Sequence, residues 1–281
     1  MEKKPKPFVK WAGGKRQLIH TLFENVPERF NNYHEPFVGG GALYFKLWSE
    51  GVIKKAYLND FNEDLISTYK MVKEKPSELI EELKSSEYKN EQSTYYKIRA
   101  EIPEDKIKKA ARFIYLNKTA FNGLYRVNSK GGFNVPFGRY KNPKICDEEN
   151  ITLVSEALKP VTLLNEDFSV VTKHAKPNDF VYFDPPYHPI SKTSFTNYTK
   201  LDFVEKDQIR LNDVYSKLDK NGTYVMMSNS TALLITQLYS NYKVMNVLAK
   251  RAINCKADQR GEVPEIVALN YGRDIHGTRT D

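Results

Sequence analysis

The sequence has only two cysteines, Cys146 and Cys255, and five histidines among its 281 residues. It contains no Cys-x-x-Cys pair, so it suggests neither a disulfide framework nor a zinc site, and the two thiols are expected to serve packing. No apolar run approaches the ~18 residues of a membrane span. The N-terminal stretch MEKKPKPFVK offers no hydrophobic core for a secretory signal. These absences predict a cytoplasmic protein with no bound metal.

Two glycine motifs of nucleotide enzymes are missing as well. The chain has no GxGxxG, and WAGGK at residues 11–15 lacks the first glycine of a phosphate-binding loop, because Val9 stands there. Nicotinamide and nucleoside triphosphate cofactors are therefore disfavoured. A different glycine run, residues 39–41, follows HEPFV at an expected passage from strand to helix. Glycines let a ligand approach the backbone closely, and a new helix offers unpaired N–H groups.

Acidic residues are missing from one long window. Between Lys106 and Lys144 the chain carries ten basic residues and no Asp or Glu. The positive charge of this window is therefore larger than the net charge of +8 for the whole chain. The same window holds seven aromatic residues, Phe113, Tyr115, Phe121, Tyr125, Phe133, Phe137 and Tyr140. Basic residues interleaved with rings suit contact with the phosphates and bases of a nucleic acid. A merely solvated basic face is the alternative.

The rest of the chain alternates between strand and helix patterns, which predicts an α/β protein with a mainly parallel sheet covered on both faces. We expect helices at 15–26 and 42–48, and strands at 33–37, 56–58, 161–164, 180–183, 223–228, 242–248 and 265–271. Residues 62–119 read as helical and charged, and a hairpin around SKGG is expected within residues 121–140. This predicts a sheet domain, residues 1–61 and 161–281, interrupted by a mainly helical insertion, residues 62–160.

Three acids follow expected strands: Asp60, Asp167 and Asp184. Each alone would be explained as a helix cap. Together they would line the same edge of one sheet, where open α/β sheets bind ligands and where an acid can bind a ribose. They predict a pocket for an adenosine-bearing ligand without phosphates. The last acid opens DPPY at residues 184–187, where two prolines end a strand rigidly, so a structural turn is the alternative to a site.

Six motifs occur in order between Phe8 and Ser230: KWAGGKR, EPFVGGGAL, LND, FNGLYRVNxxGxFNVPFGRY, DPPY and SNS. The set resembles the Dam-type DNA adenine-N6 methyltransferases of bacterial and phage GATC systems. DPPY by itself is shared with cytosine-N4 enzymes, whereas six ordered motifs are much more specific. The resemblance implies a Rossmann-like sheet that binds S-adenosylmethionine, with the insertion as the target-recognition domain. Double-stranded DNA would be the partner, and in restriction systems a separate endonuclease would work beside the enzyme.

The resemblance also assigns roles to residues. The cofactor would contact Trp11, Lys15, Glu35, Pro36, Phe37, Gly39, Gly40, Asp60, Asp167, Phe168 and Asp184. Within that set Asp60 would bind the ribose, and Asp167 with Phe168 would lie near the adenine. The DNA would contact Lys10, Phe121, Asn122, Gly123, Leu124, Arg126, Asn134, Pro136, Gly138, Arg139 and Tyr140. The catalytic motif would be Asp184, Pro185, Pro186 and Tyr187.

Chemistry supports the catalytic assignment. Adenine N6 is a poor nucleophile because its lone pair is delocalised into the ring, so the enzyme must localise it. The Asp184 carboxylate and the Pro185 carbonyl could each accept one N6 hydrogen, and Tyr187 would stack on the flipped base. The sequence alone leaves open methylation of cytosine N4 or of RNA, and a catalytically silent DNA-binding relative.

Arg126 and Phe121 are expected to contact the DNA in different ways. The guanidinium fork of Arg126 matches O6 and N7 of a guanine, with a phosphate contact as the alternative. Phe121 stands where many family members have tyrosine, so it could act as a wedge or stack but could make no hydroxyl contact. A loop at residues 191–198 is expected beside the flipped base.

Overall fold

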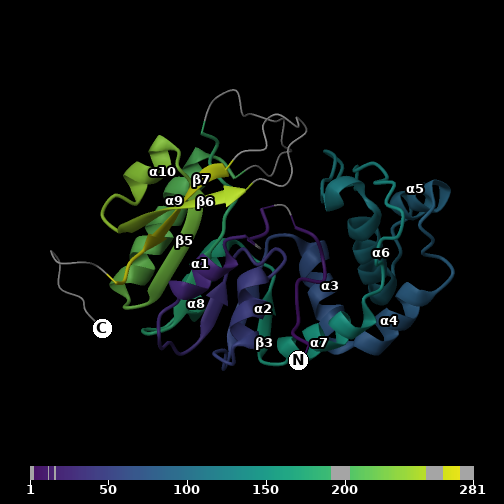
Figure 1. The fold of residues 1–281 in the computed structure, drawn as a ribbon, viewed down its shortest axis with the longest axis horizontal. Coiled ribbons are helices and arrows are strands. Elements are labelled where there is room, and N and C mark those ends of the chain that lie inside the picture. The colour runs from purple at the N-terminus through teal and green to yellow at the C-terminus, as the bar shows by residue number, and fades with distance from the viewer. Residues whose placement is uncertain (1–2, 12, 16, 191–202, 251–261, 273–281) are drawn as a thin grey trace. The chain divides into compact units, whose positions relative to one another are not determined.

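The structure is a computed structural model that describes residues 3–11, 13–15, 17–190, 203–250 and 262–272. The described strands form a sheet in the order β3-β2-β1-β4-β5-β7-β6. Their bounds are β1 Tyr33–Glu35, β2 Ala56–Asn59, β3 Val161–Leu164, β4 Phe180–Phe183, β5 Tyr224–Ser230, β6 Lys243–Lys250 and β7 Glu262–Leu269. Figure 1 labels β3, β5, β6 and β7. β1 pairs in parallel with β2 and β4, and β4 pairs in parallel with β5, whereas β7 is antiparallel to β5 and β6. A parallel sheet that runs outward from β1 on one side and from β4 on the other is Rossmann-like, which confirms the predicted fold class.

The described helices are α1 Ile19–Glu24, α2 Ala42–Ser49, α3 Glu63–Glu74, α4 Pro76–Lys84, α5 Gln92–Ala100, α6 Lys106–Thr119, α7 Glu148–Leu158, α8 Val171–His174, α9 Glu205–Lys220 and α10 Leu233–Leu238. Two 3₁₀ turns, η1 Phe121–Gly123 and η2 Phe168–Val170, complete them. The predicted helix at 15–26 was too long, because α1 begins only at Ile19 and Lys15 lies in the preceding loop. Apolar spacing does not mark a helix start, and Leu18 provides no side-chain cap.

The chain forms two compact units. The first comprises Met1–Gly14, Gly39–Val52 and Asp60–Asn165, and the second comprises Lys15–Val38, Ile53–Asn59 and Glu166–Asp281. The predicted insertion, residues 62–160, lies wholly within the first unit. The N-terminal segment and α2 belong to the same unit.

The first unit contains the expected helical stretch, in which α6 packs against α3, α4 and α5. The expected hairpin after α6 is closed by two isolated antiparallel bridges, Ala120 to Phe137 and Val127 to Phe133, and continuous strands do not form there. The Asn128 side chain explains part of this, because its oxygen accepts the N–H groups of Lys130 and Gly132 and competes with a ladder.

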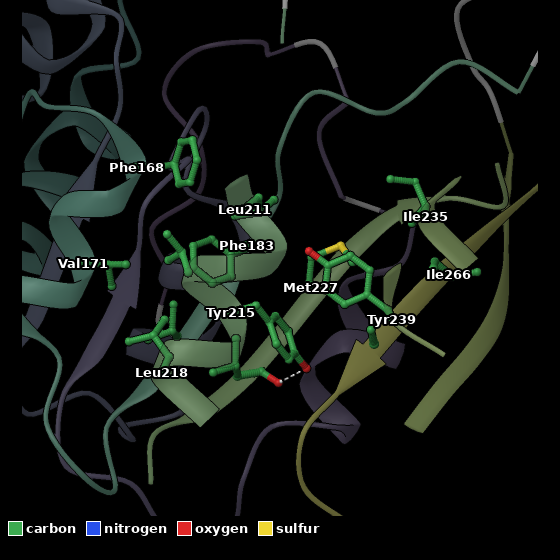
Figure 2. Close-up of a cluster of buried hydrophobic side chains, with 14 of the residues drawn as sticks. Phe168, Val171, Phe183, Leu211, Tyr215, Leu218, Met227, Ile235, Tyr239 and Ile266 are labelled. Carbon is green, nitrogen blue, oxygen red and sulfur yellow. Dashed lines mark hydrogen bonds between the residues drawn. The ribbon is translucent and has the colours of Figure 1, made fainter. Parts of the chain in front are cut away.

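The second unit has its apolar core on one face of β4 and β5, where α9 packs against β5 (Figure 2). Val181 and Phe183 of β4 point into this core, while Phe180 points to the opposite face, as the alternation of a strand requires. Tyr215 of α9 closes the core and donates its hydroxyl hydrogen to the Val225 carbonyl at 3.1 Å, the dashed line in Figure 2. This core fixes the strand that carries the DPPY motif.

Of the helices in the described part of the chain, none combines the length and apolarity needed to cross a membrane. Within the same residues there is no group of three or more His, Cys, Asp or Glu side chains suited to a metal ion. The Cys146 thiol is half-buried, and burial raises its pKa, which agrees with a packing role. Cys255 lies outside the described residues.

Candidate functional site

The carboxyl ends of β1 and β4 are neighbours in the sheet of the second unit. His34 of β1 is in register with Val181 of β4, and the two strands are where the strand order changes direction. Ligands of open α/β sheets bind beyond strand ends at such a point. Glu35 ends β1, and Asp184 directly follows β4. The sequence-predicted acids Glu35 and Asp184 therefore occupy adjacent strand ends.

Asp184 is paired with Lys15. The Lys15 ammonium lies 2.7 Å from the Asp184 carboxylate, and the lysine side chain is only 7% exposed. Burial raises the pKa of Asp184, and the charge and hydrogen bond of Lys15 oppose that rise. The same ammonium lies 4.6 Å from the centroid of the Tyr187 ring, a cation–π contact. Lys15 was predicted to meet the cofactor, and its pairing with Asp184 was not foreseen.

Buried side chains hold the backbone of the DPPY loop. Gln208 of α9 donates its amide hydrogen to the Pro186 carbonyl at 2.9 Å, and its own oxygen accepts a hydrogen bond from Asn229. Asn229 accepts the His188 N–H, and the Ser230 hydroxyl donates to the His188 carbonyl at 2.6 Å. Gln208 and Asn229 are completely buried. The SNS motif thus supplies two anchors of the loop, whereas Gln208 was missed because no local pattern marks it.

Hydrogen bonds and a ring contact also hold the end of β1 and the segment that follows it. The Tyr33 hydroxyl donates to the buried Glu35 carboxylate at 2.9 Å. The Asn59 amide at the end of β2 donates to the Pro36 carbonyl at 3.0 Å, which braces the segment that leaves β1. Phe37 then stacks on Phe168, with 5.4 Å between the ring centroids.

Asp167 and Phe168 follow β3, as predicted, and Arg210 of α9 binds both. The guanidinium forms two hydrogen bonds with Asp167, at 2.8 and 2.9 Å, and its central carbon lies 4.3 Å from the centroid of the Phe168 ring. Asp167 also caps η2 through the Ser169 N–H. Burial alone would raise the pKa of Asp167, but the hydrogen bonds from Arg210 and Ser169 lower it overall. No local sequence pattern predicts the contact with Arg210.

In the first unit, Asp60 shapes the glycine turn. Its two carboxylate oxygens accept the N–H groups of Gly39 at 3.0 Å and Asn62 at 2.9 Å, while burial raises its pKa. Gly39 has φ +46°, and a Cβ added there would lie 2.5 Å from a ring carbon of Trp11. A Cβ on Gly40 would lie 3.5 Å from the Trp11 Cβ. The predicted residues Trp11, Gly39, Gly40 and Asp60 therefore form one close-packed turn.

The predicted DNA-binding residues also lie in the first unit, and Lys10 is in contact with several of them. Its ammonium lies 4.2 Å from the centroid of the Tyr140 ring. Its side chain fills the space beside Gly123, where an added Cβ would lie 2.3 Å from the Lys10 Cδ. The buried Asn117 amide hydrogen-bonds both backbone groups of Lys10 at 2.7 Å and contacts the Gly123 carbonyl. Asn117 was not anticipated, although it joins the N-terminal segment to the hairpin.

Arg126 is oriented by Asn134 across the hairpin. The Arg126 Nε donates to the Asn134 side-chain oxygen at 2.7 Å, and one terminal nitrogen donates to the Asn134 carbonyl at 3.2 Å. Phe121 is 46% exposed. Asn122 and Arg139 both have positive φ, near +54° and +53°, which sets the turns on either side.

The remaining predicted DNA-binding residues lie in the same loop. The Phe121 N–H donates to the Pro136 carbonyl, and the Gly138 N–H donates to the Thr119 carbonyl at 2.8 Å. Leu124 directly follows η1. The predicted loop at 191–198 lies outside the described residues.

A Rossmann-like sheet whose β4 runs directly into Asp-Pro-Pro-Tyr is typical of S-adenosylmethionine-dependent methyltransferases of amino groups. The chain belongs to the D12 class N6 adenine-specific DNA methyltransferases, whose family model matches residues 11–253. It is therefore an enzyme that uses S-adenosylmethionine to methylate adenine N6 in DNA.

Curated relatives extend over nearly the whole chain. The Type II methyltransferase M.MjaIII of Methanocaldococcus jannaschii is 48% identical, over 95% of this chain and 99% of its own length. The Type II methyltransferase M1.LlaDCHI of Lactococcus lactis is 45% identical, over 95% of this chain and 96% of its own length. A DNA adenine methylase of Vibrio cholerae is 34% identical over the same shares of the two chains.

Proposed function

We propose that this enzyme methylates an adenine flipped out of duplex DNA, within the sequence 5'-GATC-3'. The observation that carries the proposal is the partly buried Asp184 carboxylate, which pairs with the same buried lysine that contacts the Tyr187 ring. A base within a duplex cannot reach a methyl donor in such a site, so it has to be flipped. The GATC target rests on the likeness of the ordered motifs to those of GATC enzymes.

The catalytic step follows from the acceptor groups of the loop. Asp184 accepts a hydrogen bond from one N6–H, and the Pro185 carbonyl accepts a hydrogen bond from the other. These two hydrogen bonds localise the lone pair of the nitrogen. Gln208 holds the adjacent Pro186 carbonyl, so the loop keeps its shape during the reaction. Tyr187 stacks on the adenine. Positioning and the exclusion of water then supply most of the rate acceleration.

S-adenosylmethionine supplies the methyl group, and several described residues have the chemistry to bind it. In the second unit, the buried Glu35 carboxylate suits the cationic amino end, and Asp167 with Phe168 suits the adenine. In the first unit, the turn has no room for a Cβ at Gly39, whereas a Cβ on Gly40 would make only ordinary contacts. A backbone without side chains at this turn suits close approach to a ligand. Asp60 beside this turn is proposed to bind the ribose.

Residues 62–160 are proposed to recognise the target. The basic window meets phosphates. Arg126 reads a guanine with the hydrogens of Nη1 and the second hydrogen of Nη2, because Nε and the first hydrogen of Nη2 bond to Asn134. Phe121, half-exposed, stacks or wedges at the vacated position. In a restriction system a separate endonuclease would share this site.

The test uses labelled S-adenosylmethionine and two duplexes that differ only in the presence of GATC. After digestion, label should appear as N6-methyladenine, and from the GATC duplex alone. N6-methyladenine from both duplexes would overturn the GATC target while leaving the enzyme class intact, and N4-methylcytosine would overturn both.

A matched pair of variants tests the catalytic role. Asp184→Ala should bind the duplex but transfer no methyl, whereas Asp213→Ala, which changes an exposed acid on α9, should behave as the wild type. Methyl transfer retained by Asp184→Ala would refute the role of its carboxylate.

A further inference from the structure

The Tyr187 ring is held by two contacts from different parts of the second unit. Lys15 lies over its face, and its hydroxyl donates a hydrogen bond to the Glu265 carboxylate at 2.7 Å. Burial raises the pKa of Tyr187 well above its ordinary value, so the phenol keeps its hydrogen and acts as the donor. A hydrogen bond to a carboxylate is about twice as strong as one between neutral groups, and it fixes direction.

Glu265 is well placed to fix a ring. It lies on β7, between β5 and β6, and it is in register with Ser230 of β5 and Val247 of β6. Its register partner Ser230 holds the His188 carbonyl, one residue beyond Tyr187. The backbone after the ring and the hydroxyl at its tip are thus anchored by one pair of facing strand residues.

The negative charge of Glu265 is unfavourable for the ionisation of Asp184. Burial is the main cause that raises the pKa of Asp184, and the charge of Glu265 adds to that rise. In the proposed reaction Asp184 must stay ionised to accept a hydrogen bond from N6. A neutral residue at 265 would avoid this repulsion. The carboxylate at this position does accept the hydrogen bond from Tyr187.

We propose that Glu265 is a positioning residue for methyl transfer, which holds the Tyr187 ring in the orientation that stacks on the flipped adenine. The proposal rests on the stacking role given to Tyr187 above. Glu265 acts through the tyrosine hydroxyl and need not touch the DNA or the cofactor. A ring free to turn about its side-chain bonds would lose part of the stack, and a misplacement near 1 Å can cost about a hundredfold in rate.

A double-mutant cycle tests this with single-turnover methyl transfer on a GATC duplex. Glu265→Ala and Tyr187→Phe should each lower the rate by a similar factor, roughly ten- to a hundredfold. The combined variant should be no slower than either, because both changes break the same hydrogen bond. Glu265→Gln keeps an acceptor oxygen and should recover most of the rate, and Glu205→Ala, an exposed acid of α9, is the matched control.

Binding measurements separate positioning from a general effect on the fold. The dissociation constant for the duplex and the midpoint of urea unfolding should stay near wild-type values in Tyr187→Phe and Glu265→Gln, while the rate of Tyr187→Phe falls. Losses that multiply in the combined variant, or a full rate in Tyr187→Phe, would overturn the inference. If the wild type fails to form N6-methyladenine in a duplex, the proposed function fails instead.

Discussion

Replacing Lys15 by methionine should make Asp184 harder to ionise. Methionine keeps the apolar length of the side chain and removes the ammonium that lies 2.7 Å from the carboxylate. Burial already raises the pKa of Asp184, and Lys15 is the group that opposes this. Without it the pKa rises further. In the proposed reaction the carboxylate must be charged to accept a hydrogen bond from N6, so activity should be lost at a higher pH on the acid side of the rate profile.

The size of the effect follows from the geometry. Two unit charges 4 Å apart interact by about 4 kcal/mol at an effective dielectric constant of about 20. The Asp184 side chain is 20% exposed, so solvent screens part of this. An opposite charge at such a distance commonly moves a carboxyl pKa by about 1–3 units. The acid limb of the rate profile should therefore move upward by about 1 to 3 pH units.

The assay is single-turnover methyl transfer across the pH range, at saturating duplex and S-adenosylmethionine. Lys206→Met, which removes an exposed lysine of α9, is the matched control and should keep the wild-type profile. A uniform loss of rate in Lys15→Met, with the acid limb unmoved, would refute the reasoning. It would leave Lys15 as a cofactor-binding residue that does not control the charge of Asp184.

Three further changes test other parts of the molecule. Gly39→Ala should weaken S-adenosylmethionine binding at least tenfold, because the new Cβ would clash with Trp11 and the residue needs φ +46°. Titration calorimetry measures the affinity, and an unchanged affinity would contradict this prediction. Arg126→Ala should cost about 1–3 kcal/mol of discrimination at one base pair if the residue reads a guanine, and a uniform loss over all sequences would indicate a phosphate contact. Asp179→Ala leaves His34 and the backbone donors of a buried cluster without their acceptor, so urea unfolding at pH 7 should show a loss of roughly 3 kcal/mol. Burial alone would raise the pKa of Asp179, but the hydrogen bonds of His34 and the backbone lower it overall. The contribution of Asp179 to the free energy of unfolding is therefore complete above the unfolded pKa of about 4 and disappears as the pH falls through the folded pKa. Equal stability of the wild type and the variant at pH 5 would contradict this.

The fold could be predicted largely because the central strands are short, mainly buried runs with clear ends. Phe180–Phe183 is the best case, since four apolar residues run into an acid and two prolines. Asp60, Asp167 and Asp184 could be found by the rule that acids at strand ends share one edge. The hairpin was harder, because Asn128 takes up backbone N–H groups that the pattern assigned to a ladder.

The supports of the site could not be predicted, because they join residues far apart in the sequence. Gln208 lies 22 residues from the Pro186 carbonyl that it binds, and Glu265 lies 78 residues from Tyr187. In the sequence Glu265 is one of two glutamates in an otherwise apolar strand. Only the antiparallel register of β7 against β5 places its carboxylate beside the tyrosine hydroxyl.

The two prolines of DPPY explain the shape of the loop but not its direction. Each fixes its own φ and removes one backbone donor, so Pro185 and Pro186 make a stiff segment. A stiff segment can still pivot as a whole about the end of β4. The anchors at Pro186, Tyr187 and His188 prevent this, and they come from α9, β5 and β7. In the proposed reaction the Asp184 carboxylate and the Tyr187 ring contact the same adenine. The rate should therefore depend on the packing of β7, although the proposed reaction takes place at the end of β4.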